Sequence, residues 1–109
     1  MSMSLQVRNE RCELFFEECK DILERKGIDY EVNGDAMEEI YQLARQLKIS
    51  PAQVIYVYMA KHLSALGNFI ERGALVSEGI RERLKDVANY CALMGVVLEL
   101  QEDEHGRLE

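Results

Sequence analysis

Three carboxylates near the start of the last predicted helix carry the clearest chemical signal in this sequence. Glu78, Glu82 and Asp86 are spaced by four, and Asn89 follows three residues later. At about 100° per residue these spacings place the four side chains in one stripe along a helix. Carboxylates suit Mg²⁺ or Mn²⁺, with water and phosphate completing the coordination. Glu78, Glu82 and Asp86 are therefore candidate metal ligands, and Asp86 is also a candidate catalytic residue.

The same helix carries an apolar seam on the side opposite the stripe: Ile80, Leu84, Val87, Cys91, Met94 and Leu98. Residues 91–98 are apolar nearly all round, which predicts burial on every side. The stripe should therefore face another helix, of this chain or of a second copy. Crowded carboxylates there need compensation, because they repel one another and lose hydration. A divalent cation is one solution, and salt bridges to Arg81, Arg83 or Lys85 are the other.

Two further groups of residues are candidates for contacting a substrate. Lys61 interrupts a mostly apolar stretch and could meet phosphate oxygens as a catalytic and binding group, or snorkel at the surface. His62 shares a face with apolar neighbours, so a hydrogen-bonded core histidine competes with a ligand role. Asp29 and Tyr30 lie in a predicted loop after the first helix, where an aspartate usually caps local backbone.

Composition limits the classes of protein to which the chain can belong. With 109 residues, 30% of them charged, and a formal charge of −7, it predicts one globular domain and argues against a nucleic-acid groove. A nucleotide held through a metal ion remains compatible with that charge. No apolar run is long enough to span a bilayer. Cys12, Cys19 and Cys91 lack metal-ligand spacing and suggest buried free thiols in a reducing cytoplasm.

Helix signals divide the chain into four segments joined by short connections. The expected helices cover residues 4–26, 35–48, 50–72 and 77–100, with Asp35 and Ser50 as N-caps and Gly73 ending the third. The fold class is all-α, a four-helix bundle formed by residues 1–103. Residues 104–109 are a polar tail whose end resembles a vector-derived sequence. A homodimer that pairs the last helices, or a higher homo-oligomer, would cover the apolar end of the fourth helix.

The order of these motifs resembles a known family. The segments are Lys26-Gly27-Ile28-Asp29-Tyr30, then Lys61-His62-Leu63, then residues 78–90. They resemble the small phage and bacterial proteins termed nucleotide-modification-associated. Those proteins are similar in turn to the MazG-like, all-α nucleoside triphosphate pyrophosphohydrolases.

The resemblance implies an oligomeric helical bundle that hydrolyses a nucleoside triphosphate to the monophosphate and pyrophosphate. It implies Mg²⁺ held by carboxylates of two antiparallel helices, with Glu82 and Asp86 matching one pair and Lys61 the basic position. Asp29, Tyr30, Lys61, His62 and Asn89 would then contact the nucleotide. The other expected pair, Glu-x-x-Glu, is missing from its usual place, and Glu38-Glu39 lacks the flanking pattern. The alternative to a hydrolase is a non-catalytic nucleotide-binding or structural helical assembly protein.

Overall fold

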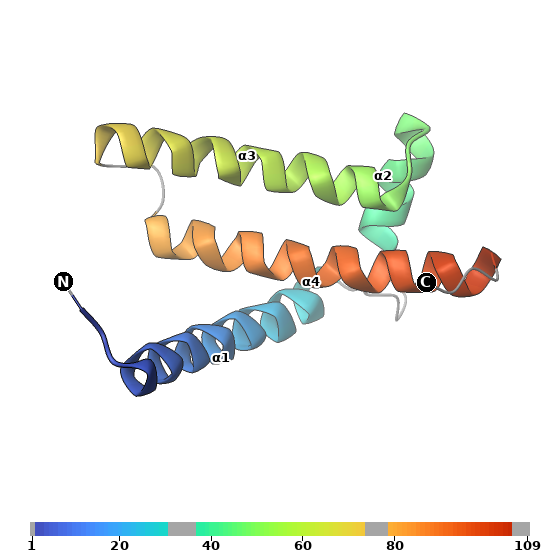
Figure 1. Ribbon diagram of the computed structural model, residues 1–109. Coiled ribbons are helices and arrows are strands. Elements are labelled where there is room, and N and C mark those ends of the chain that lie inside the picture. The colour runs from blue at the N-terminus through green and yellow to red at the C-terminus, as the bar shows by residue number, and fades with distance from the viewer. Residues whose placement is uncertain (1, 31–36, 74–78, 106–109) are drawn as a thin grey trace.

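The computed structural model describes residues 2–30, 37–73 and 79–105 and confirms the all-α four-helix bundle. The helices are α1 (Leu5–Tyr30), α2 (Glu38–Leu47), α3 (Pro51–Arg72) and α4 (Ile80–His105). In Figure 1, α3 and α4 run antiparallel side by side, α1 crosses below α4, and α2 turns across the far end of α3. None of the described helices has both the length and the apolar character needed to cross a membrane.

The core is small and lies where α2, α3 and α4 meet. Its buried members are Ile40 and Ala44 of α2, Val54 and Ile55 of α3, and Val97 of α4. Tyr58, Met59, Tyr90, Leu93 and Met94 are among the half-buried side chains that pack around them. This core fixes α2, α3 and α4 relative to one another, whereas α1 attaches to α4 through the buried Cys19 and the polar contacts described below.

The boundaries of α3 follow the sequence signals closely. Ser50 Oγ accepts a hydrogen bond from the Gln53 backbone N–H, and the Gln53 side chain accepts one from the Ser50 N–H, which completes a capping box. Pro51 occupies the first turn, where its missing N–H has no helical partner to lose. Gly73 ends the helix at φ 82°, a left-handed conformation that glycine adopts without a steric penalty.

Three other boundaries differ from expectation. The N-cap position of α2 is Met37, with no side-chain cap, whereas the predicted cap Asp35 lies outside the described residues. α1 continues through Gly27 to Tyr30, because a helix tolerates one glycine at a cost of about 1 kcal/mol. The segment holding Asp29 is therefore helical and not a loop. α4 extends to His105, five residues beyond its predicted end.

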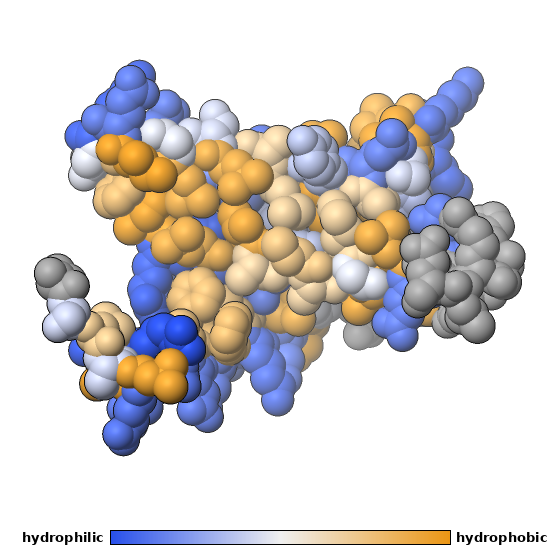
Figure 2. All heavy atoms as spheres, viewed as in Figure 1, coloured by the Kyte–Doolittle hydropathy of each residue, from blue (hydrophilic) through white to orange (hydrophobic). Residues whose placement is uncertain are grey.

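Within a single chain the apolar side of α4 is only partly covered, and two of the three thiols are not buried as predicted. Within one chain, Leu84 and Leu98 remain 42% and 44% exposed, and of residues 91–98 only Val97 is buried. Cys19 is buried, but Cys12 and Cys91 are exposed free thiols. α1, α2 and α3 of a single chain leave one side of α4 uncovered, and cover by a second copy stays a prediction. Figure 2 shows the consequence, since apolar side chains gather on the visible face over α3 and α4.

Candidate functional site

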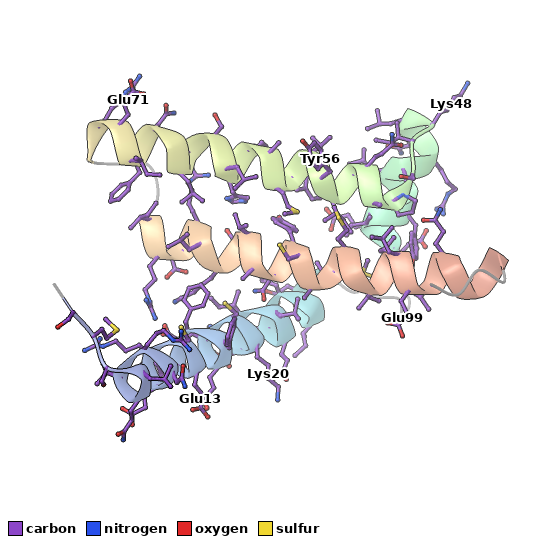
Figure 3. The ribbon with its side chains drawn as sticks, viewed as in Figure 1. Glu13, Lys20, Lys48, Tyr56, Glu71 and Glu99 are labelled. Carbon is purple, nitrogen blue, oxygen red and sulfur yellow. The ribbon has the colours of Figure 1, made fainter. Side chains whose placement is uncertain are left out.

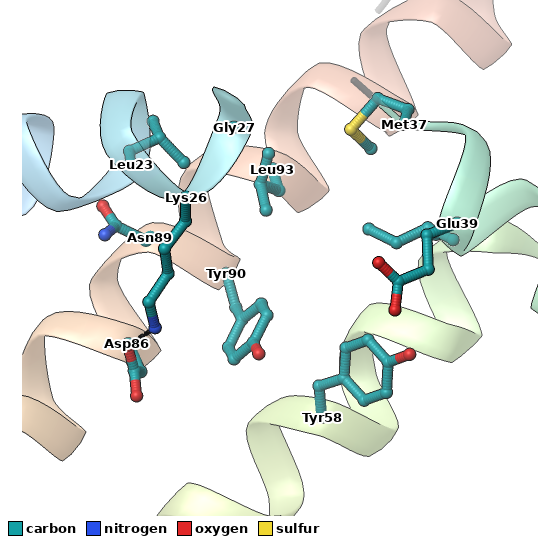
Figure 4. Close-up of a pocket in the computed structure, with 11 residues that line it drawn as sticks. Leu23, Lys26, Gly27, Met37, Glu39, Tyr58, Asp86, Asn89, Tyr90 and Leu93 are labelled. Carbon is teal, nitrogen blue, oxygen red and sulfur yellow. Dashed lines mark hydrogen bonds and ion pairs between the residues drawn. The ribbon is translucent and has the colours of Figure 1, made fainter. Parts of the chain in front are cut away.

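A pocket of about 310 Å³ lies between all four helices and is the natural place for a small ligand. Figure 4 shows Lys26 of α1 and Asp86 of α4 at one side of it, and Glu39 of α2 with Tyr58 of α3 at the other. Tyr90 of α4 stands between these two groups. The pocket thus combines one cation, two carboxylates and two aromatic rings in a largely apolar lining.

Asp86 is the more buried of the two carboxylates that line the pocket, since Glu39 is exposed. Its side chain is only 14% exposed, and its Oδ1 accepts a hydrogen bond from Lys26 Nζ at 3.2 Å. Its Oδ2 lies 3.8 Å from Nε2 of His62 on α3. Lys26 is 54% exposed, so this cation can leave the carboxylate at little cost. Asp86 of α4 therefore lies between the Lys26 ammonium group of α1 and the His62 imidazole of α3.

His62 lies beside the pocket without lining it. Its Nδ1 is 3.3 Å from Nη1 of Arg83, and its ring packs 5.7 Å from the ring of Tyr90. With a side chain 15% exposed, it has the surroundings of the half-buried, hydrogen-bonded histidine considered from the sequence. Its Nε2 lies beside Asp86 but beyond hydrogen-bond distance, at 3.8 Å from Oδ2.

A separate ion network joins the first turn of α4 to α1. Arg81 and Lys85 both bind Glu18, through contacts of 2.8 and 3.2 Å, and Lys85 also pairs with Glu82 at 3.3 Å. Hydrogen bonds from Arg81 and then Lys85 lower the pKa of Glu18 from its usual 4.5 to about 2. Burial alone would lower the pKa of Lys85, but its hydrogen bonds to Glu18 and Glu82 raise it. Glu82 is thus compensated by a neighbouring lysine and remains 52% exposed.

Two residues of the predicted stripe, Asp86 and Asn89, face α1, whereas Glu82 is 52% exposed and pairs with Lys85 of its own helix. Asp86 contacts Lys26, and the Asn89 side-chain amide donates a 3.0 Å hydrogen bond to the backbone oxygen of Cys19 on α1. Glu78, the first predicted residue of the stripe, lies outside the described residues. Within the described residues no group of three histidine, cysteine or acidic side chains could hold a metal ion. The metal-ligand role of Glu78, Glu82 and Asp86 stays a prediction.

The remaining predicted substrate contacts are not brought into the pocket. Lys61 is exposed and makes no ion pair with the described residues, but it lies one turn after Tyr58, on the same side of α3. Asp29 is exposed in the last turn of α1, and the Tyr30 side chain lies outside the described part. Asp86 and Asn89 are therefore the predicted residues that line the pocket.

Sequence reasoning missed four residues of the site. In the sequence, Lys26 stands out only as the first residue of the motif Lys26-Gly27-Ile28-Asp29-Tyr30, and Glu39 belongs to a pair without the flanking pattern. Tyr58 and Tyr90 have the spacing of core residues, and their rings do pack together at 5.7 Å. Burial, and then the charge of Glu39, raises the pKa of the Tyr58 hydroxyl, which keeps it a hydrogen-bond donor. These four residues come from four different helices, so only the tertiary structure shows that they line one pocket.

Comparison with known proteins adds no assignment: no family model, no curated protein and no solved structure matches this chain.

Proposed function

We propose that this chain binds a nucleoside or deoxynucleoside triphosphate with Mg²⁺ in the pocket and hydrolyses it to the monophosphate and pyrophosphate. The observation that carries the proposal is the placement of Asp86 and Glu39, carboxylates of two different helices, on one pocket that also holds Lys26. The two tyrosine rings offer apolar, stackable surface for a base. Lys26 offers charge to a phosphate, and its exposure leaves it free to move between Asp86 and a ligand.

The donor set is compatible with magnesium. Mg²⁺ in nucleotide sites is commonly held by one or two carboxylates together with waters and substrate phosphates. Asp86 would be the main ligand. Glu82, one turn earlier on the same helix but outside the pocket lining, would have to leave Lys85 to become the second. Bound Mg²⁺ neutralises phosphate charge and makes a coordinated water more acidic.

The chain's own residues supply the rest of the chemistry. Glu39 lines the pocket and is the carboxylate available to accept a proton from water. His62 and Arg83 hold the side of the pocket around Asp86 and Tyr90. Lys61, one turn from Tyr58, is the additional cation that would stabilise charge developing on phosphate.

One observation favours a second candidate, a nucleotide-binding module without turnover. Lys26 at 3.2 Å and His62 at 3.8 Å already surround Asp86 with cationic or potentially cationic groups. A carboxylate compensated in this way requires no metal for stability. In that case a nucleotide would bind through Lys26 and the tyrosines and leave unchanged.

Pyrophosphate release from a panel of standard and modified dNTPs, with Mg²⁺ or Mn²⁺, tests the proposal. We expect metal-dependent release by the wild type and a loss of about 100-fold or more in Asp86→Asn. Asp21→Asn is the matched control, because Asp21 is an exposed α1 carboxylate paired only with Arg25 among its described contacts. Release that is absent with every nucleotide, together with a nucleotide-dependent rise in melting temperature, would favour the binding module.

A further inference from the structure

Two lines of apolar side chains with a seven-residue repeat run along neighbouring helices. The line on α3 is Tyr56, Leu63 and Ile70, and the line on α4 is Leu84, Cys91 and Leu98. All six are exposed in the single chain: Cys91 is exposed, and the other five range from 42% for Leu84 to 83% for Ile70. Monomeric proteins rarely expose large contiguous apolar patches, and two parallel heptad lines are typical of a helix-packing surface. We call these six residues the α3/α4 face.

The two lines lie on the same side of the helix pair. On α3 each residue of the face comes directly after one of positions 55, 62 and 69. These positions form the line that faces α4, because His62 contacts that helix. On α4 each member follows a residue of the line 83, 90 and 97, whose Arg83 and Tyr90 contact His62. Both helices are right-handed and antiparallel, so one step of about 100° from the contact line leads to the same side. Figure 2 shows the apolar face that results.

The solvent-accessible area of the chain points in the same direction. It is 8365 Å² for a mass of 12.6 kDa. A folded monomer of that mass is expected to expose roughly 6,200 Å², which leaves a surplus of about 2,000 Å². A stable protein–protein interface buries about 800 Å² on each partner. The surplus is spread over the whole chain, α1 included, and it exceeds the area that one partner contributes to a stable dimer.

We infer that the α3/α4 face is covered by the same face of a second copy of this chain. The face is self-complementary, because small residues repeat beside the large ones: Ala60 and Gly67 on α3, and Ala88 and Gly95 on α4. A Cβ added at Gly67 or Gly95 would meet nothing within 4 Å, so open space lies beside the ridges. Ridges of one copy can enter the grooves of the other under two-fold symmetry. This inference does not depend on the proposed function.

Sedimentation equilibrium of the full chain is the first test. The wild type is expected at twice the 12.6 kDa chain mass at micromolar concentration. Leu63→Glu and, separately, Ile70→Glu place a charge on the face and should give folded monomers of unchanged helix content. Ile70 is 83% exposed in one chain, so its substitution removes little intrachain packing.

Phe16→Glu is the control for the position of the surface. Phe16 is 65% exposed on α1, beside Glu13 and Lys20, which Figure 3 shows on the side of α1 turned away from α4. This variant should remain a dimer. A monomeric wild type would overturn the inference, and so would a dimer that Phe16→Glu breaks while Leu63→Glu and Ile70→Glu do not.

Thiol labelling gives an independent readout. The Cys91 thiolate attacks an aryl disulfide reagent, forming a mixed disulfide and releasing the aryl thiolate, at a rate that depends on access. Cys12 and Cys91 are both exposed in one chain. The Cys12→Ser variant reports the reaction rate of Cys91, and the Cys91→Ser variant reports that of Cys12. In the dimer, the rate for Cys91 should be at least tenfold lower than the rate for Cys12. Adding Ile70→Glu should remove this protection, and unchanged protection of Cys91 in the monomeric variant would contradict the dimer surface.

Discussion

Lys26 Nζ lies 3.2 Å from Asp86 Oδ1, an ion pair that joins α1 to α4 across 60 positions of sequence. The pair is asymmetric, since Lys26 is 54% exposed and Asp86 only 14%. Removal of the lysine would leave a mostly buried carboxylate, whereas the lysine itself is hydrated without its partner. The same asymmetry lets Lys26 serve both as a structural contact and as a cation available to a ligand.

Lys26→Met should lower the free energy of unfolding by about 1 kcal/mol, because Asp86 loses its closest cation while the apolar stem of residue 26 is retained. Urea denaturation at neutral pH measures the change. Lys20→Met is the control, since Lys20 is an exposed lysine of α1 without an ion pair among the described residues. Equal effects of the two substitutions would show that the contact with Asp86 contributes nothing.

Glu18 makes stability dependent on acid. The unfolded chain takes up a proton at this group near pH 4.5, whereas the folded chain resists protonation down to about pH 2. The stability from Glu18 is therefore complete above pH 4.5 and is lost as the pH falls through 2. We expect Glu18→Gln to melt below the wild type at pH 7, with a difference that shrinks between pH 4.5 and 2. A difference that stays constant over this interval would assign the effect to packing.

A comparison of Ile55→Ala with Ile28→Ala tests whether the small core between α2, α3 and α4 contributes most of the stability. Ile55 is fully buried, so Ile55→Ala should cost about 2–5 kcal/mol through lost transfer energy and a cavity. Ile28 is 76% exposed near the end of α1, and Ile28→Ala should change stability by less than about 0.5 kcal/mol. Chemical denaturation of both variants provides the comparison. A loss at position 28 that rivals the loss at 55 would mean that α1 packs more tightly than its exposure indicates.

These examples show how far sequence reasoning reaches. Ser50, Pro51 and Gly73 act on backbone groups within one turn of themselves, so local signals located both ends of α3 correctly. The partner of Asp86 is 60 positions away, and no periodicity within α4 could identify Lys26. The seam of α4 was recognised as apolar, but periodicity reports that a face is apolar and not which helix covers it. For this reason the sequence left open whether a helix of the same chain or a second copy covers the seam.

The backbone of Lys48 adopts a left-handed conformation that is unfavourable for a residue with a side chain, so a glycine there should stabilise the fold. Lys48 closes α2 at φ 58°, ψ 42°, and its backbone N–H reaches the carbonyl oxygens of Ala44 and Arg45. The left-handed region disfavours residues with a Cβ, so Lys48→Gly should raise the free energy of unfolding by about 0.5–1 kcal/mol. Lys48→Ala keeps the Cβ and should bring no such gain. If alanine stabilised as much as glycine, the lysine side chain and not the backbone would be the source of the cost.

Substitution of Lys61 distinguishes a catalytic role of this lysine from a role as an ordinary surface lysine. Lys61 is exposed and unpaired with the described residues, so Lys61→Met should change the free energy of unfolding by less than about 0.5 kcal/mol. If Lys61 stabilises charge on phosphate, the same substitution should lower kcat for pyrophosphate release about 10- to 100-fold. Turnover and urea denaturation are measured on one preparation, with Lys20→Met as the control. Unchanged turnover in an active enzyme would make Lys61 a snorkelling lysine, and a large loss of stability would make it a packing residue.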